Sequence, residues 1–296
     1  MEGKEYGKKQ VADVARFLRY VLKYPIALKK TSQITRGMVL DFRTSLQTDP
    51  RFSTKPRTIN RTFAALSSVY SEALYRGELK YNPFPGIGNI KYKPKIKEIL
   101  TPEELKSFFK REFFPSETAF KVFSLAAYTG LRMSELLALH WDQYSDGTLS
   151  IDRAWKTEHE LGSPKWGKSR SYPLSELAIS CLPEKTDSLI FHRNGIRLGS
   201  TWWIKNFRAA LSNAEIKKDI SPHCLRHSLN SNLLLAGVSP FLIQHYLGWS
   251  KDSSLTKVQE DYTHVKAEHL HPVADMIDSL YSVSERNNII QFRKIE

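Results

Sequence analysis

The sequence predicts an α+β protein: an all-helical module, followed by a mixed module in which a small antiparallel sheet lies among helices. Three observations predict this fold class. Apolar residues recur with helical spacing from about residue 8 to residue 82, and no strand pattern interrupts them. A basic stretch rich in proline then separates the two modules. Beyond it, short strand-like runs lie between further helical segments.

Three amphipathic helices account for the first module, which we place at residues 1–85. The run "VADVARFLRYVL" puts its apolar residues on one stripe. A second helix is expected in "TRGMVLDFRTSLQ", where Thr35 can cap the first turn. A third helix runs through "KPRTINRTFAALSSVYSEALYRGEL" and ends near Gly77. Its start is strongly basic, with Lys55, Arg57 and Arg61.

Residues 86–99 are predicted to form an extended basic linker. The stretch from residue 82 to residue 100 holds three prolines and two glycines, and few of its residues could build a core. "LTPEEL" then opens the second domain, at residues 100–296, with Thr101 as N-cap and Glu104 at the third helical position. The lysines of the linker alternate along the chain: Lys91, Lys93, Lys95 and Lys97.

The second domain is expected to be mixed. A helix in "ETAFKVFSLAAYTG" should end at Gly130, and "LRMSELLALHW" should start another. "TLSIDRAW" and "SPKWGKSRSYPL" are typical of strands in a small antiparallel sheet. In "SPHCLRHS" a helix is expected to begin at Ser221. The later helices are expected at residues 175–181, 200–215, 222–236 and 240–247.

Positive charge is concentrated in the first third of the chain. The net charge is +13 at pH 7. Residues 1–100 hold 20 Lys and Arg against 8 Asp and Glu, whereas residues 101–296 hold 24 against 23. This asymmetry predicts a basic module that meets a polyanion, joined to a near-neutral module with a different task.

The sequence favours a cytoplasmic, intracellular location. Its two cysteines, Cys181 and Cys224, form no disulfide framework, which is typical of a reducing compartment. The start "MEGKEYGKKQ" has no apolar region of the kind found in secretory signals. The most apolar stretch carries Arg132 and Glu135, which argues against a membrane span.

Five features carry side chains suited to phosphate chemistry. Arg132 and Glu135 lie three apart in "TGLRMSEL", on one helical face, so that the carboxylate can hold the guanidinium. "HCLRH" places His223 and Arg226 at the same spacing, and an imidazole beside a planar guanidinium suits a phosphate. Alone, each feature also has an ordinary structural explanation. The other three are the hairpin residues Lys165, Lys168 and Arg170, Trp249 in "YLGWS", and Tyr262 in "QEDYTHV".

The "HCLRH" stretch also has a rival interpretation as a metal site. His223 and His227 are four apart, with Cys224 nearby, which is acceptable spacing for zinc. However, the stretch lacks the intervening Glu of a metalloprotease, and Arg226 would repel a divalent cation. We therefore predict no bound metal.

In their order along the chain, these features resemble the tyrosine recombinase, or phage integrase, family. "TGLRMSEL" resembles the first box of the family and "HCLRHS" the second, while "LGWS" and "DYTHV" follow in the expected order. The resemblance covers nearly the whole chain. It implies a core-type DNA-binding domain at residues 1–85 and a catalytic domain with a C-terminal tail at residues 100–296.

The resemblance also implies an activity, namely site-specific DNA recombination of the integrase type. Strands would be cleaved and rejoined through a 3′-phosphotyrosine intermediate, with Tyr262 as the nucleophile. His223 would be the general base or proton relay, and Lys165 the general acid for the leaving 5′-oxygen. Because the covalent bond conserves the energy of the phosphodiester, no ATP and no other cofactor is expected.

The remaining site residues are expected to bind or to support the phosphate. Arg132 and Arg226 would clamp it, and Trp249 would donate its indole N–H to it. Glu135 would orient Arg132 from behind, and His227 would buttress its helix. The residues expected to contact DNA are Lys55, Arg57, Arg61, Lys91, Lys93, Lys95, Lys97, Lys168 and Arg170.

Two positions depart from the family pattern or leave a choice. Tyr262 follows Trp249 by thirteen positions, a rather long spacing for the family, which bears on the pose of the tyrosine. Tyr246 and Tyr281 are poorer candidates for the nucleophile, because the first precedes the tryptophan turn and the second lies beyond the motif. The catalytic lysine is less certain: Lys165 matches best, while Lys168 and Lys156 are within reach on the same hairpin.

The expected partners are double-stranded DNA and further copies of the chain. The family implies a homotetramer in the synaptic complex, from a monomer or weak oligomer when free, with accessory DNA-bending or directionality proteins and no membrane. Because the first helix is expected to begin by about residue 8, we expect no additional small β-rich domain before it. The apolar tail "IIQFRKI" is expected to pack on its own domain or on a neighbouring subunit.

Three other functions are less favoured by the sequence. A type IB topoisomerase shares the chemistry and would relax supercoils without a recombination partner. A catalytically silent DNA-binding factor has no need of the complete set of site residues. An RNA-binding module is not favoured, because the aromatic ribonucleoprotein signatures are missing.

Overall fold

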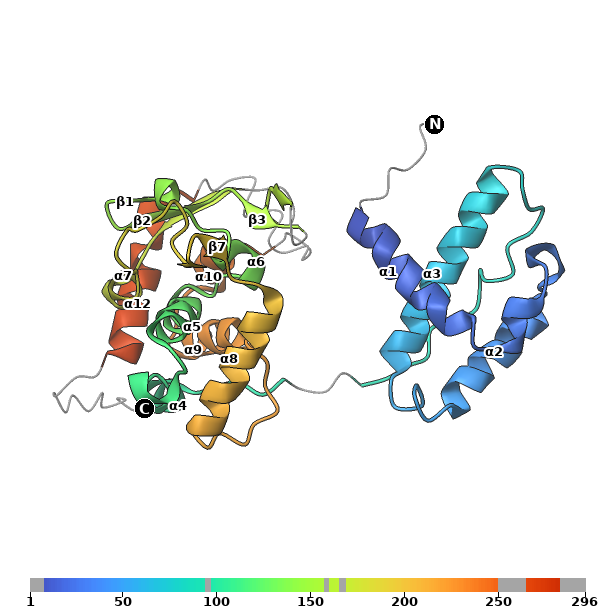
Figure 1. The fold of residues 1–296 in the computed structure, drawn as a ribbon, viewed down its shortest axis with the longest axis horizontal. Helices are drawn as coiled ribbons and strands as arrows, with labels where there is room; N and C mark the ends of the chain where they lie inside the picture. The colour runs from blue at the N-terminus through green and yellow to red at the C-terminus, as the bar shows by residue number, and fades with distance from the viewer. Residues whose placement is uncertain (1–7, 94–96, 157–159, 165–168, 250–264, 283–296) are drawn as a thin grey trace, which may run out of the picture. The chain divides into compact units, whose positions relative to one another are not determined.

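The chain forms two compact units, Met1–Ile96 and Lys97–Glu296, in the computed structural model. The structure describes residues 8–93, 97–156, 160–164, 169–249 and 265–282. The first unit is helical, and the second combines helices with short antiparallel strands (Figure 1). The predicted α+β fold class is therefore confirmed.

Helices build the first unit around a core of its own. They are α1 (Lys8–Val21), α2 (Arg36–Thr48) and α3 (Pro56–Tyr75), with short 3₁₀ turns between α1 and α2. The Thr35 hydroxyl accepts a hydrogen bond from the Met38 amide at 3.3 Å, which caps α2 as the sequence predicts. The core is aromatic and aliphatic, with Val39, Phe42, Leu46, Ile59 and Phe63 at its centre.

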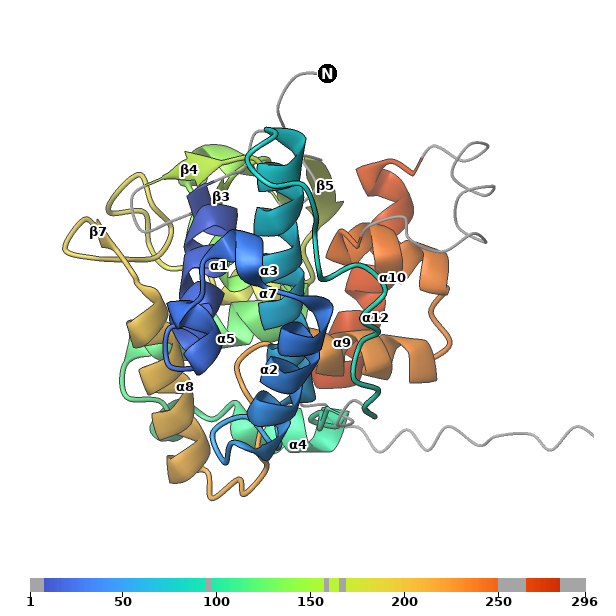
Figure 2. The same ribbon diagram turned by 90° about the vertical axis from the view of Figure 1, so that its right-hand side faces the viewer.

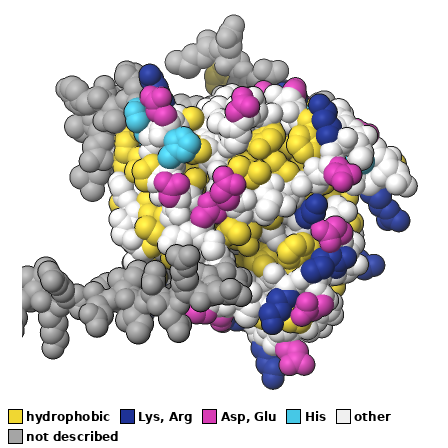
Figure 3. Space-filling model, turned by 90° about the vertical axis from the view of Figure 1, so that its left-hand side faces the viewer, with side chains coloured by type: hydrophobic (Ala, Val, Ile, Leu, Met, Phe, Trp, Pro, Cys, Tyr) yellow, Lys and Arg dark blue, Asp and Glu magenta, His cyan; other side chains and the backbone are white. Residues whose placement is uncertain are grey.

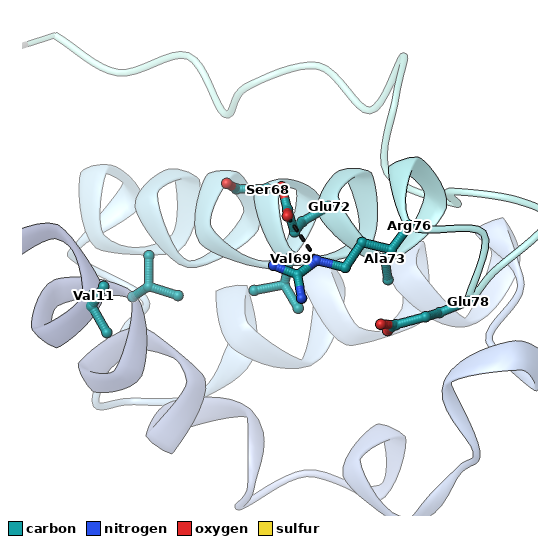
Figure 4. Close-up of a pocket in the computed structure, with 8 residues that line it drawn as sticks. Val11, Ser68, Val69, Glu72, Ala73, Arg76 and Glu78 are labelled. Carbon is teal, nitrogen blue, oxygen red and sulfur yellow. Dashed lines mark hydrogen bonds and ion pairs between the residues drawn. The ribbon is translucent and has the colours of Figure 1, made fainter. Parts of the chain in front are cut away.

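A pocket opens between α1 and α3 of this unit. Valines and an alanine form much of its wall, and an ion pair between Glu72 and Arg76 lies at its edge (Figure 4). Figure 2 shows the two helices that border it. Its lining offers no tyrosine, histidine or cysteine, so it is not a candidate for the tyrosine chemistry that the sequence predicts.

The second unit is built around two packed helices, α5 (Glu117–Thr129) and α9 (Cys224–Leu235) (Figure 1). Before them, Thr101 and Glu104 form the predicted capping box of α4 (Pro102–Phe108). Among the described residues, the other α-helices are α6 (Met133–Leu136), α7 (Glu176–Ser180), α8 (Ser200–Asn213), α10 (Pro240–Leu247) and α12 (His271–Tyr281). The helices and strands of this unit share a single apolar core that includes Phe123, Leu136, Leu225 and Tyr246.

Short antiparallel strands lie at one end of this unit (Figure 1). The main sheet has three strands in the order β1-β2-β5, and Ile151 of β2 pairs with Arg170 of β5. Its strands are β1 (Tyr144–Ser145), β2 (Thr148–Ile151) and β5 (Arg170–Pro173). The described part of this unit also holds two further strand pairs: β3 (Ala154–Trp155) with β4 (Leu161–Gly162), and β6 (His192–Arg193) with β7 (Ile196–Arg197).

Two local expectations were wrong. The helix expected to begin at Ser221 begins at Cys224, because the Cys224 amide bonds to the Ser221 carbonyl in a tight turn that precedes the helix. The helix expected through "LRMSELLALHW" is reduced to α6, and Arg132 lies before it in an extended conformation, at the N-cap position. His223 and Arg132 therefore lie at the starts of helices and not on helix faces.

The surface seen from the side of α12 carries interspersed acidic and basic side chains around apolar ones (Figure 3). Such mixing agrees with the near-balanced charge of residues 101–296, which hold 24 Lys and Arg and 23 Asp and Glu. Among the described residues, no helix is both long enough and apolar enough to cross a membrane.

Candidate active site

A buried carboxylate, Glu135, holds two arginines. Its side chain has no exposed surface, and its Oε1 accepts a hydrogen bond from Arg132 Nη1 at 2.7 Å. Its Oε2 accepts one from Arg170 Nη2 at 2.8 Å and a longer one from the Arg132 amide at 3.2 Å. Burial alone would raise the pKa of this carboxyl, but the two guanidiniums lower it below its ordinary value. Glu135 is therefore a carboxylate at neutral pH.

Arg226, the second of the two arginines expected to clamp a phosphate, lies beside Arg132 and Glu135. It comes from the first turn of α9 and is buried. Its Nη1 donates to the Gly130 carbonyl at 2.6 Å and its Nη2 to the Leu247 carbonyl at 2.6 Å. Burial and the nearby Arg132 lower the pKa of Arg226, but a guanidinium stays charged at neutral pH.

Two glycines make this arrangement possible. Gly130 ends α5 and Gly248 ends α10, both in the left-handed conformation, with φ of 60° and 65°. A side chain at Gly130 would collide with Leu247. The Gly248 carbonyl accepts a hydrogen bond from Arg132 Nη2 at 2.9 Å. Arg132 and Arg226 are thus anchored to the carbonyls of consecutive residues, Gly248 and Leu247, which brings both guanidiniums to the same turn.

His223 lies at the N-cap of α9, close to the arginines. Its ring meets that of His227 edge-on, with centroids 4.8 Å apart. Burial lowers the pKa of His223 to about 4, and the neighbouring His227 ring and the cations Arg226, Lys97 and Arg132 act in the same direction. The imidazole is therefore neutral at pH 7 and able to accept a proton.

Lys97 reaches the same group of residues. Its Nζ lies 2.9 Å from His227 Nε2, and because an ammonium can only donate, the ring nitrogen accepts and His227 is neutral. Burial and Lys97 lower the pKa of His227. The described residues contain no cluster of three or more His, Cys, Asp or Glu of the kind that could hold a metal.

Trp249 completes the described part of the site. It follows Gly248 directly, the residue is 40% exposed, and the Arg226 guanidinium lies 5.8 Å from the centre of its ring. A half-exposed indole at this place can offer its N–H to a ligand bound by the arginines. The geometry brings together six of the residues that the sequence singled out as catalytic or supporting: Arg132, Glu135, His223, Arg226, His227 and Trp249.

The remaining expected site residues are undescribed, paired with this cluster or exposed. Tyr262, Lys165, Lys168 and Lys95 lie outside the residues that the structure describes. Arg170, expected to contact DNA from a hairpin, instead has a side chain that is only 13% exposed and paired with Glu135. The other residues expected to bind DNA are exposed: Lys55, Arg57, Arg61, Lys91, Lys93 and Lys97.

Sequence reasoning missed three contacts of this site. They are the pair of Arg170 with Glu135, the contact of Lys97 with His227, and the backbone carbonyls that hold the arginines. Only the carbonyls had a signal in the sequence. Gly130 and Gly248 are glycines at predicted helix ends, and each lies within two positions of an expected site residue, Arg132 or Trp249. The other two contacts join residues 35 and 130 positions apart, beyond the reach of any local pattern.

The fold and the site, with two anchored arginines beside a neutral histidine, are those of a class of enzyme suited to phosphodiester chemistry. Residues 99–269 match the model of the phage integrase family. This is more than half of the chain, so the chain belongs to the phage integrase family. It is a tyrosine-type site-specific recombinase, as the sequence predicts.

Curated relatives are similar in sequence to this chain over most of their length. The chain is 28% identical to tyrosine recombinase XerD of Lacticaseibacillus casei over 73% of this chain and 74% of that protein. It is 29% identical to a tyrosine recombinase of Thermosipho africanus, over 80% and 81% of the two chains. It is 26% identical to tyrosine recombinase XerC of Listeria welshimeri, over 87% and 86%.

Solved structures show the same fold. The Tn1549 transposon integrase in complex with a circular-intermediate DNA superposes with a TM-score of 0.70 at 16% identity, over 92% of this chain and 95% of that one. A lambda integrase dimer bound to a COC′ core site gives 0.69 at 16% identity, over 99% and 75%. Neither set of matches supports a topoisomerase or a silent DNA-binding factor.

Proposed function

We propose that the cluster of Arg132, Arg226, His223 and Trp249 binds the scissile phosphate of duplex DNA. The observation that carries this proposal is the anchoring of the two guanidiniums to the adjacent carbonyls of Leu247 and Gly248. Each guanidinium keeps further N–H groups for a ligand, and paired guanidiniums suit the two non-bridging oxygens of a phosphodiester. In cleavage these oxygens gain charge, which the same donors stabilise.

Tyr262 is the proposed nucleophile. Its oxygen attacks phosphorus, the bond from phosphorus to the 5′-oxygen breaks, and a 3′-phosphotyrosine remains. The rivals Tyr246 and Tyr281 are unsuitable, since both side chains are buried in the core. Burial raises the pKa of Tyr246 well above its ordinary value, and Tyr281 accepts a hydrogen bond from Asn232 at 3.0 Å. Neither oxygen could reach a phosphate on the surface.

Two groups would handle the protons. His223, whose ring is neutral at pH 7, accepts the proton of the attacking tyrosine or relays it. Lys165 gives a proton to the leaving 5′-oxygen, which departs as a hydroxyl. Rejoining is the reverse: a 5′-hydroxyl attacks the phosphotyrosine and restores both the DNA backbone and the tyrosine. Every bond broken in one direction is remade in the other, so the cycle uses no ATP.

Duplex DNA and other copies of the chain are the proposed partners. The solved integrases are bound to DNA, and a lambda integrase tetramer is bound to a Holliday junction. By analogy we propose a tetramer on two duplexes, accessory directionality proteins, and a cytoplasmic location on DNA. We further propose a two-part enzyme with domains at residues 1–85 and 100–296. In it, the exposed basic residues of the first unit and the linker at residues 86–99 bind DNA.

Recombination of the DNA that flanks the gene tests this function. The protein is expressed with that DNA on a plasmid, and the junctions formed are amplified and sequenced. We expect joined products with the wild type and none with Tyr262→Phe or Arg226→Gln. Relaxation of supercoiled plasmid without any joined product would favour a topoisomerase, and no change of the DNA in any assay would refute the proposal.

A further inference from the structure

Arg170 lies behind the phosphate-binding cluster and not on the surface. It begins β5, pairs across the sheet with Ile151, and its side chain is 13% exposed. Both of its terminal nitrogens face Glu135, at 2.8 Å from Oε2 and 3.4 Å from Oε1. The carboxylate of Glu135 is thus shared between Arg132 on one side and Arg170 on the other.

Arg170 also supports the second anchor of Arg132. A Cβ atom placed on Gly248 would lie 2.7 Å from the guanidinium carbon of Arg170, so the guanidinium packs directly against the Gly248 backbone. The carbonyl of that same glycine holds Arg132 at 2.9 Å. Arg170 therefore touches both groups that position Arg132, the Glu135 carboxylate and the Gly248 turn.

The strand that carries Arg170 is itself fixed to α10. Tyr172, two residues along β5, packs on Tyr246 with ring centroids 4.5 Å apart, and neither side chain has exposed surface. The strand β5 therefore contacts the end of α10 twice, through Arg170 at Gly248 and through Tyr172 at Tyr246. Trp249 follows that glycine, so the same support sets the position of the indole.

We propose that Arg170 is a positioning residue for strand cleavage: it fixes Glu135 and the Gly248 turn, and through them Arg132 and Trp249. This inference rests on the proposed function of the cluster. It assigns to Arg170 a role different from direct contact with DNA. Without Arg170, Glu135 would pair with Arg132 alone, and the Gly248 turn would lose the guanidinium on which it rests. The result would be a misplaced phosphate clamp in a protein that still binds DNA.

Comparison of Arg170→Gln and Arg170→Lys with the wild type tests this role. A matched control is Arg153→Gln, since Arg153 lies near the same sheet but pairs with Asp142 and Asp152 at the surface. Cleavage is measured in a single turnover at saturating nicked DNA, and affinity is measured over a series of salt concentrations. Thermal melting reports whether each variant is folded.

We expect Arg170→Gln to cleave roughly 10- to 100-fold more slowly at saturating DNA, because a shift of about 1 Å in a positioned group has a cost of this order. Affinity and its salt dependence should stay as in the wild type. Arg170→Lys, which keeps one charge beside Glu135, should recover part of the rate. Arg153→Gln should cleave normally.

Two outcomes would overturn the proposal. A normal rate at saturating DNA, with a salt slope smaller by about 0.9, would show that Arg170 contacts a phosphate directly. A normal rate with a normal slope would show that Arg170 has no role. If Arg170→Gln does not fold, the folded Arg170→Lys must still lose rate without losing affinity. Absence of any covalent complex in the wild type would instead refute the proposed function, and this inference with it.

Discussion

Glu135→Gln removes one negative charge from the centre of the site and keeps the shape of the side chain. In the wild type, the fully buried carboxylate balances two guanidiniums, which are themselves only 19% and 13% exposed. Removal of one member of a buried ion pair typically costs about 3–5 kcal/mol, because a buried charge is left unbalanced. Since both arginines keep some exposure, we expect the free energy of unfolding to fall by about 2–4 kcal/mol.

This loss should depend on pH with a definite sign. The pKa of Glu135 is lower in the folded protein than in the unfolded chain, so its stabilisation is present above the unfolded-state pKa of about 4.3. It is lost as the pH falls through the folded-state pKa. The difference in unfolding free energy between wild type and Glu135→Gln should therefore be constant from pH 8 to about pH 5.5 and shrink below about pH 4.

Urea unfolding followed by circular dichroism at several pH values measures this difference. Glu117→Gln is the matched control, because Glu117 forms an ion pair with Arg111 in which both side chains are about half exposed. Exposed pairs contribute little, so the control should unfold almost as the wild type does. A Glu135→Gln difference below about 0.5 kcal/mol, or one that does not shrink in acid, would refute the reasoning.

Three further predictions concern the proton acceptor, the proton donor and the basic module. Titration of His223 by NMR in the DNA-free protein should give a pKa of about 4. Lys97→Met should raise this pKa, because Lys97 is one of the cations that lower it. An ordinary pKa near 6.5 in the wild type would contradict the buried site lined by cations. Lys165→Ala should slow cleavage by roughly 10²–10⁴-fold and be rescued by a substrate with sulfur in place of the scissile 5′-oxygen, which needs little protonation. Rescue of Lys168→Ala in place of Lys165→Ala would reassign the acid. Replacement of Lys55, Arg57 and Arg61 by Gln should reduce the salt slope of DNA binding by about 0.9 for each phosphate that these side chains neutralise, and an unchanged slope would exclude these residues from the interface.

Local signals in the sequence predicted much of this fold. The Thr35 cap, the capping box of Thr101 and Glu104, and the glycines that end α5 and α10 lie where the chain pattern places them. Each depends on a few neighbouring residues, so one stretch of sequence is enough to predict it. The predicted start of α9 was three residues too early, because a turn and a helix start share the same Ser-Pro signature.

The support of the site could not be predicted in the same way. Spacing suggested the pair of Arg132 and Glu135, but on a helix face, whereas Arg132 is extended and Glu135 reaches back to it. The contact of Arg170 with Glu135 and that of Arg132 with Gly248 join segments 35 and 116 positions apart. Such contacts depend on how the sheet and α10 pack on the core, which periodicity does not report. The low pKa of His223 depends on the same packing, since burial is its main cause.

The most direct test of the central claim is to map the tyrosine that becomes joined to DNA. A nicked substrate traps the covalent complex, nuclease and protease reduce it to a peptide that carries a short nucleotide, and mass spectrometry locates the modified residue. Tyr246→Phe and Tyr281→Phe serve as controls, because both side chains are buried in the core. We expect the nucleotide on Tyr262, no covalent complex from Tyr262→Phe, and DNA affinity in that variant close to that of the wild type. A nucleotide on any other residue, or a complex that persists in Tyr262→Phe, would contradict the account.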